Sequence, residues 1–123
     1  MAKRFTRPVA AALDETSYLY IRSGGDHRFI AVWPVVVNGR LFARSWNDKP
    51  TGWRQAFLED PDGEIRLGER VLRVRARPVK GERLNAAIDE AYRAKYTSKS
   101  SLKWTRGLTR GKRRDTTTEF IPR

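Results

Sequence analysis

The sequence predicts a mostly β protein, an antiparallel β-barrel with peripheral helices. Short runs of β-branched and aromatic residues recur between Gly, Asn and Asp turn signals, which is typical of hairpin-connected strands. One later run alternates apolar residues with arginines, as a half-exposed strand does. Because a chain of 123 residues has room for one core, the strands and the few helices are expected to share a single domain.

The first strands are expected over residues 18–23 and within 28–46, where YLYIRS and RFIAVWPVVVNGRLFARSW are rich in β-branched and aromatic residues. Asn38 and Gly39 divide the second run and form a strong hairpin signal. Pro34 has no N–H to donate to a sheet, so the strand is expected to bend there or to lie at an edge. Three antiparallel strands result.

A short helix and two more strands are expected next. GWRQAFLED, over 52–60, has helical spacing and ends at a Pro-Asp-Gly turn. Strands are expected over 64–68 and 69–79. In the second of these, RVLRVRARP places its apolar residues on one face and its arginines on the other, so the arginines are expected to face solvent.

Both ends of the chain carry further elements. Residues 1–17 are expected to form an N-terminal helical extension, since Pro8 precedes an alanine-rich stretch. Residues 18–123 are expected to form the single barrel domain, which includes an amphipathic helix over 83–96, RLNAAIDEAYRAKY. TTTEFIPR at the C-terminal end predicts a closing strand.

Positive charge is the strongest bulk property, with a net charge of +12 and a pI of about 10.9. Lys99 to Arg123 contains eight Lys and Arg against two acidic residues, which is half of the total net charge. A field of this sign attracts anions such as nucleic acid or phosphorylated cofactors. Residues 99–114 are therefore a candidate polyanion contact, with a solvated, solubilising surface as the equally weighted alternative.

Several classes of chemistry are not expected. The chain has no cysteine and a single histidine, His27, so disulfides, thiol catalysis and an ordinary zinc site are excluded. No pair of carboxylates or nucleophile–base motif identifies a catalytic residue. No apolar run is long enough for a signal peptide or a membrane span, so a cytoplasmic protein without membrane contact is expected.

The best candidate binding site is the connection over residues 44–54. It carries cations and a hydroxyl of the kind that bind a phosphate monoester, namely Arg44, Ser45, Lys49 and Arg54. Flat apolar surface for a ring system comes from three tryptophans, Trp33, Trp46 and Trp53. The combination suits a flavin or a nucleotide. The alternative is that the tryptophans are core or dimer contacts and the cations are solvated.

The RSW-turn-WR connection, the segment AIDEAYRAKY and the Thr-rich strand ending in Pro122 and Arg123 resemble a bacterial family catalogued as domain of unknown function 2255. The resemblance runs from Tyr18 to Arg123. This family is similar in its barrel to the FMN-binding split-barrel superfamily, which includes pyridoxamine phosphate oxidase-like and deazaflavin-dependent nitroreductase-like proteins. The resemblance therefore implies an antiparallel split barrel.

The same resemblance implies FMN or a deazaflavin as cofactor, bound between the two subunits of a homodimer. Four positions match the connection that lies beside the cofactor in the relatives, Arg44, Ser45, Trp53 and Arg54. Trp46 and Lys49 are neighbours of that connection. If the protein is an enzyme, it would be a flavin-dependent oxidoreductase of unknown substrate. Two alternatives stay open: a nucleic-acid-associated basic module, and a cofactor-free barrel that acts through protein contacts.

Overall fold

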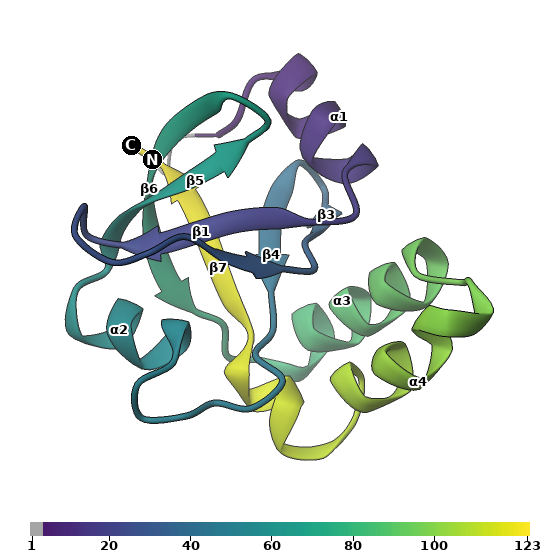
Figure 1. Ribbon diagram of the computed structural model, residues 1–123. Helices are drawn as coiled ribbons and strands as arrows, with labels where there is room; N and C mark the ends of the chain where they lie inside the picture. Colours follow the sequence, from purple (N-terminus) through teal and green to yellow (C-terminus); the bar gives the residue numbers. More distant parts are fainter. Residues whose placement is uncertain (1–3) are drawn as a thin grey trace.

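The computed structural model describes residues 4–123, which fold into one seven-stranded antiparallel sheet surrounded by helices (Figure 1). The strands are β1 (Leu19–Ser23), β2 (Ile30–Val32), β3 (Val35–Val37), β4 (Arg40–Ala43), β5 (Asp62–Leu67), β6 (Arg70–Pro78) and β7 (Thr118–Pro122). The helices are α1 (Arg7–Glu15), α2 (Trp53–Glu59), α3 (Glu82–Lys95), α4 (Lys99–Leu108) and the 3-10 helix η1 (Gly111–Thr116). The first three residues of the expected N-terminal extension lie outside the described residues.

The sheet is a split barrel, because its two edge strands are consecutive in the chain. The strand order is β2-β1-β5-β6-β7-β4-β3, so β2 and β3 occupy opposite edges although only Trp33 and Pro34 separate them. The sheet must therefore curl until its edges meet, as Figure 1 shows. Both expectations for Pro34 are confirmed, since the strand is interrupted there and its two halves lie at edges. The predicted fold class, a mostly β antiparallel split barrel with peripheral helices, is confirmed.

The inside of the curl is filled by one core. Ile21, Ile65 and Val74 are fully buried on the inner face of the sheet, and α1 and α2 add Leu13 and Phe57 to the same cluster. Each such side chain contributes about 1.5–3 kcal/mol through burial. The arginines that alternate with the apolar residues of β6 are exposed, as the sequence predicts.

Helix α3 lies against the outer face of the sheet at β3 and β4. Its Ile88 and Tyr92 form a second buried cluster with Val35 and Phe42. The helix covers nearly the predicted range 83–96. It leaves the outer face of β5 and β6 uncovered, which is where the exposed arginines lie.

Helix α4 packs beside α3 (Figure 1) and is an element that sequence reasoning missed. Its buried face is formed by Ser101, Thr105 and Leu108, and the alternation of this face with exposed cations is a helical signal that was overlooked in a segment interpreted by its charge. Its start is nevertheless well defined, because the Ser98 side chain accepts a hydrogen bond from the backbone N–H of Ser101. The segment 99–114, treated above as a basic run, is thus mostly helical.

A cluster of ion pairs ties three strands together on the outer face. Arg40 on β4 donates two hydrogen bonds to the Glu119 carboxylate, at 2.9 and 2.8 Å, and Arg77 on β6 donates a third at 2.8 Å. Glu119 lies on β7, between those strands. Burial opposes ionisation of this carboxyl, but the hydrogen bonds from Arg40 and Arg77 outweigh it and lower the pKa of Glu119.

We expect Glu119→Gln to lower the free energy of unfolding at neutral pH by about 1–3 kcal/mol, because charge-assisted hydrogen bonds are lost. Since the pKa of Glu119 is lowered by folding, its contribution is complete above the ordinary value of 4.5 and is lost as the pH falls through the folded value. Urea denaturation of both proteins at neutral pH and in acid measures this. A difference between the two proteins that did not shrink on acidification would contradict it.

Candidate functional site

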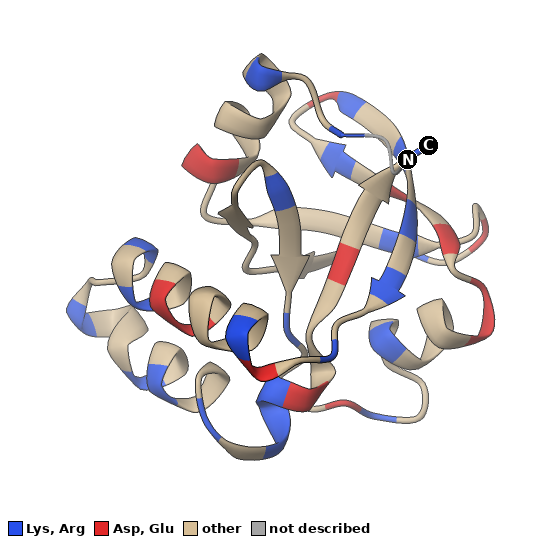
Figure 2. Cartoon of the chain, turned by 180° about the vertical axis from the view of Figure 1, so that it is seen from behind, with Lys and Arg blue, Asp and Glu red and all other residues tan. Residues whose placement is uncertain are grey.

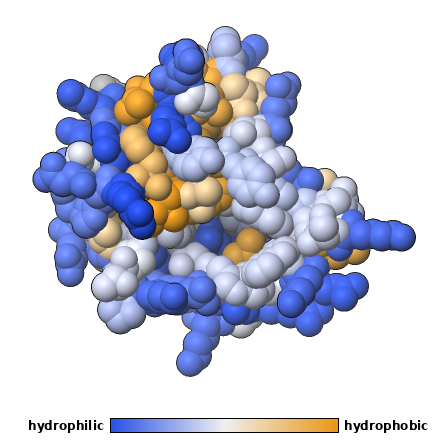
Figure 3. Space-filling view, in the orientation of Figure 1, coloured by the Kyte–Doolittle hydropathy of each residue, from blue (hydrophilic) through white to orange (hydrophobic). Residues whose placement is uncertain are grey.

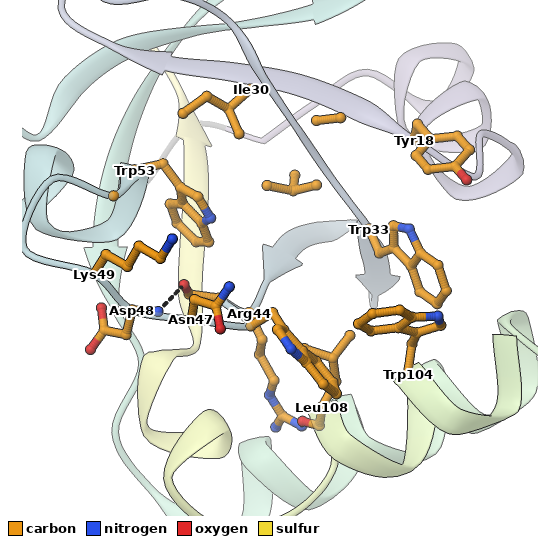
Figure 4. A pocket seen from close by; sticks show the side chains of 15 residues that line it. Tyr18, Ile30, Trp33, Arg44, Asn47, Asp48, Lys49, Trp53, Trp104 and Leu108 are labelled. Atoms are coloured by element: carbon orange, nitrogen blue, oxygen red, sulfur yellow. Dashed lines mark hydrogen bonds between the residues drawn. The ribbon is translucent and has the colours of Figure 1, made fainter.

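An open cavity of about 610 Å³ lies where the β4–α2 connection meets β2 and α4 (Figure 4). Seen from outside, this face is hollowed between α4 and the apolar surface over β1 and β2 (Figure 3). Six of the seven residues predicted to bind a cofactor line the cavity, namely Trp33, Arg44, Ser45, Trp46, Lys49 and Trp53. Arg54 is not among the lining residues. The structure therefore gathers the predicted set around one space.

Aromatic rings form most of the cavity's walls. Trp53, at the start of α2, stands on one side, and Trp33 and Trp104 stand on the other (Figure 4). Trp33 is held in place by stacking on Tyr96 of α3, with ring centroids 4.6 Å apart, while Tyr18 packs edge-on against it at 6.5 Å. The walls are thus flat, apolar and fixed by further packing.

Trp46 joins the β4–α2 connection to α4 and η1. Its ring packs edge-on against Trp104 with centroids 4.6 Å apart, and the guanidinium of Arg113 lies 3.7 Å over it. Arg113 also donates a hydrogen bond to the Trp46 carbonyl oxygen at 2.9 Å. Gly107 of α4 is required at this contact, because a Cβ there would lie 2.3 Å from the indole.

Arg44 lines the cavity, but its guanidinium serves the fold. The group points away from the cavity (Figure 4) and is fully buried. Its five N–H groups donate to the Thr117 hydroxyl, the Asp89 carboxylate, the Leu108 carbonyl, and the carbonyl and side-chain oxygens of Asn85. No donor is left for a phosphate. Arg44 is therefore a structural residue of the cavity wall.

The other predicted polar residues divide into two roles. Arg54 donates a hydrogen bond to the Asp48 carboxylate at 2.8 Å and so braces the turn. The Ser45 hydroxyl accepts from the backbone N–H of Asp48 at 2.9 Å, which leaves its own proton free to donate. Lys49 is exposed, extends along the cavity (Figure 4) and forms no ion pair within residues 4–123. Among the predicted polar residues, Lys49 and Ser45 are thus the ones that remain available to a ligand.

Tyr92 of α3 and Tyr96, the residue that follows this helix, hold the segment between β2 and β3. The Tyr92 hydroxyl donates to the Trp33 carbonyl at 2.8 Å and accepts from the backbone N–H of Arg44 at 3.1 Å. The Tyr96 hydroxyl donates to the Pro34 carbonyl at 2.7 Å. Burial raises the pKa of Tyr92, so the phenol keeps the proton that it donates. The Trp33–Pro34 segment and the start of the β4–α2 connection are therefore both positioned by hydroxyl groups from α3 and its C-terminal end.

Several lining residues were missed by sequence reasoning, namely Tyr18, Ile30, Trp104 and Leu108. Trp104 lies in the segment 99–114 that was interpreted as a polyanion contact, whereas the structure turns it towards the cavity. The available signal was the spacing of Trp104 and Leu108, which places both on one face of a helix once α4 is recognised.

The cavity can hold a planar ligand that carries an anionic group. It offers flat rings, one free ammonium, hydroxyl groups and a side-chain amide, while its carboxylate, Asp48, is paired with Arg54. His27 lies in the β1–β2 turn and does not line it. Within the described chain, no group of His, Cys, Asp and Glu could hold a metal ion. The site is suited to binding and orientation and has no general acid–base pair of its own.

The family described as "Uncharacterized protein conserved in bacteria (DUF2255)" matches residues 11–120. The chain belongs to this family. The match covers β1 to β6, the first part of β7 and every residue that lines the cavity. No curated protein matches this DUF2255 chain.

Solved structures share the fold of this DUF2255 protein at low sequence identity. A conserved hypothetical protein from Mycobacterium tuberculosis has a TM-score of 0.64 at 12% identity, over 98% of this chain and 82% of the other. An F420-H2-dependent reductase has a TM-score of 0.61 at 16% identity, over 85% and 93%. A FAD-binding protein from Mesorhizobium loti has a TM-score of 0.55 at 12% identity, over 99% and 91%. These likenesses establish the split-barrel fold.

The helices of the described residues are short and polar. None of them is long and apolar enough to cross a membrane.

We expect Asp89→Ala to lower the free energy of unfolding of this DUF2255 protein by about 3–5 kcal/mol, because the buried Arg44 guanidinium would lose its carboxylate. The side chain of Arg44 is 0% exposed, and Arg114 donates to the same carboxylate. A matched control is Arg93→Ala on the same helix, whose pair with Glu90 is exposed and contributes about 0–1 kcal/mol.

Chemical denaturation of both variants measures the difference. The double variant Arg44→Met, Asp89→Leu should be less destabilised than Asp89→Ala, because no charge is then left buried alone. If Asp89→Ala cost no more than Arg93→Ala, the buried pair would not be what holds this wall of the cavity.

Proposed function

We propose that the protein binds a flavin-type cofactor, FMN or a deazaflavin, in the tryptophan-lined cavity. The observation that carries this proposal is a space of about 610 Å³ between facing indole rings, with the free ammonium of Lys49 at its side. Cofactor pockets of about 300–1,000 Å³ with apolar walls and a few polar groups are typical. The fold, shared with an F420-H2-dependent reductase and a FAD-binding protein, supports the same proposal.

The residues present fit such a cofactor in two parts. The ring system would lie between Trp53 on one side and Trp33 with Trp104 on the other, as the facing walls suggest. A phosphate or other anionic end would contact the Lys49 ammonium and the Ser45 hydroxyl. Arg44 and Arg54 act indirectly in this proposal, because their guanidinium groups hold the connection that carries those two residues.

The bound ring would supply the hydride chemistry of a reductase, which makes an oxidoreductase the reaction class that we propose. The chain's own residues would bind and orient the ring and exclude water with their indole walls. The absence of an acid–base pair among the lining residues is compatible with this division of labour.

We further propose that the cavity is completed by a second copy of the chain. Three apolar residues on its rim are open to solvent, with exposed fractions of 57% for Tyr18, 43% for Ile30 and 41% for Trp104. Large apolar side chains gathered at one rim mark an interaction surface. A structural neighbour with a TM-score of 0.57 and 19% identity, over 90% of this chain and 82% of the other, is described as a domain-swapped dimer.

Titration of the purified protein with FMN, riboflavin and an F420-type deazaflavin, followed by tryptophan fluorescence, tests the cofactor proposal. We expect quenching of tryptophan fluorescence at micromolar concentrations, because all four tryptophans of the chain line the cavity. Three of them were predicted to do so. Lys49→Gln should weaken FMN about tenfold, or about 1.4 kcal/mol, and leave riboflavin, which has no phosphate, unchanged. The matched control Lys80→Gln removes an exposed cation that does not line the cavity.

Two outcomes would contradict the proposal. Binding of none of the three compounds below about millimolar concentration would favour the cofactor-free barrel. Equal weakening of FMN and riboflavin by Lys49→Gln would show that the lysine does not recognise the phosphate.

Sedimentation velocity tests the dimer separately. We expect the wild type to sediment as a dimer and Ile30→Asp to shift it to monomer, because a carboxylate on the rim would be buried without a partner. Leu58→Asp is the control, since Leu58 is also exposed, at 48%, but lies on α2 outside the cavity lining. A wild type that remained monomeric at about 100 μM would contradict the dimer.

A further inference from the structure

We propose that the outer face of α4 binds the phosphate backbone of nucleic acid, without reading the bases. Four cations, here called the basic stripe, define this face: Lys99, Lys103, Arg106 and Arg110. The proposal concerns a surface outside the cavity and does not depend on a bound cofactor.

The basic stripe is a geometrically compact feature. At about 100° per residue Lys99, Lys103 and Arg106 fall within about 60° of one another around α4, and at about 1.5 Å per residue they extend over about 10 Å. Arg110 lies just beyond the last residue of α4, Leu108. Trp104 and Leu108 lie on the opposite side of the helix, facing the cavity. A polyanion on the stripe would therefore leave the cavity free.

The four charges of the stripe are available to a partner. All four side chains are exposed, and the ion pairs of the described chain are made by other residues. Figure 2 shows α4 with basic and no acidic segments. By contrast Arg113 stacks on Trp46, and Arg114 pairs with Glu82 and Asp89. Five cations of the segment 99–114 are thus exposed and without an ion pair among the described residues, and all of them except Lys112 of η1 belong to the basic stripe.

A depression between α3 and α4 lies beside the basic stripe. A cavity of about 390 Å³ between α3 and α4 is lined by Arg106 and Arg110 of the stripe and by Arg93 from α3. Arg93 also pairs with Glu90, whereas the guanidinium groups of Arg106 and Arg110 form no ion pair in the described chain and can donate several hydrogen bonds to a single phosphate. Thr105 and Thr109 at its base already donate their hydroxyl protons to backbone carbonyls. The donors of this depression are therefore all cationic, which favours an anion.

The chemistry of the stripe favours a chain of phosphates over a membrane. Membrane insertion of a helix needs a broad exposed apolar face, whereas the exposed apolar side chains of α4 are Leu102 and Trp104 alone, set among exposed cations. A row of spaced cations matches a row of phosphates. The stripe itself holds no aromatic residue for base stacking, and the neighbouring Trp104, whose ring lies 5.7 Å from the Lys103 ammonium, lines the cavity. Binding is therefore expected to be independent of sequence.

Fluorescence anisotropy with a labelled 20-nucleotide single strand tests the proposal. We expect binding at about 50 mM salt with a slope of log K against log salt of about −3, as four neutralised phosphates predict. The variant Lys99→Gln, Lys103→Gln, Arg106→Gln should bind at least about tenfold more weakly, with a slope near −1. The control Arg28→Gln, Arg70→Gln, Lys80→Gln has the same net charge, and its exposed cations lie outside α3 and α4.

Thermal melting followed by circular dichroism establishes that both triple variants fold. Equal affinity for two unrelated base sequences and loss of binding in the stripe variant alone would support the proposal. Equal weakening in both variants would mean that only the bulk charge acts, and would overturn it. So would the absence of wild-type binding at about 50 mM salt, or tighter binding of polyglutamate of equal charge, which would assign the face to acidic protein segments. None of these readouts involves a flavin.

Discussion

The buried guanidinium of Arg44 is the constraint on which the rest of the molecule depends. Its donors reach the residue before β7 through Thr117, α3 through Asp89 and the end of α4 through Leu108. A charge with no exposure is tolerable only when every donor is satisfied, because the desolvation of an unpaired ion costs several kcal/mol. The arrangement of strand β4, the closing strand and both covering helices is therefore specified at one point. The hydrogen bonds of the Arg44 guanidinium therefore also position the cavity wall.

The split in the barrel is the second constraint, because it leaves backbone carbonyls without a partner strand. Hydroxyl groups from α3 and its C-terminal end bond to these carbonyls. Between β2 and β3 the chain crosses from one edge of the sheet to the other through Trp33 and Pro34, so their carbonyls have no partner strand. Tyr92 and Tyr96 supply hydroxyl donors there. The Tyr92 hydroxyl also accepts from the N–H of Arg44, which links the split to the β4–α2 connection. A cavity forms at this place because two edges that do not hydrogen-bond to each other are kept apart by side chains.

Local patterns predicted the strands well and the site only partly. The Asn38-Gly39 turn, Pro34 and the alternating arginines act over a few residues, so their meaning can be read from sequence. The role of Arg44 depends on partners between 41 and 73 residues away, which no local pattern contains. Helix α4 was not predicted for a different reason, since its buried side carries hydroxyl groups and a glycine that faces Trp46. The tryptophans were found because indole rings are large wherever they lie, whereas their facing arrangement is a product of the fold.

Some cations of the chain hold the fold, and others remain available to a ligand. This division follows from the chemistry of arginine and lysine. Arginine offers a planar fork of donors that can meet several carbonyls and carboxylates at once, so it is the cation used at Arg44, at Arg113 over Trp46 and at Arg114 between two acids. Lysine is a point charge on a flexible stem and is less able to organise such a junction. In the cavity this leaves Lys49 as the cation without an ion pair among the described residues. A net charge of +12 therefore overstates what a ligand can meet, because much of it already holds the fold together.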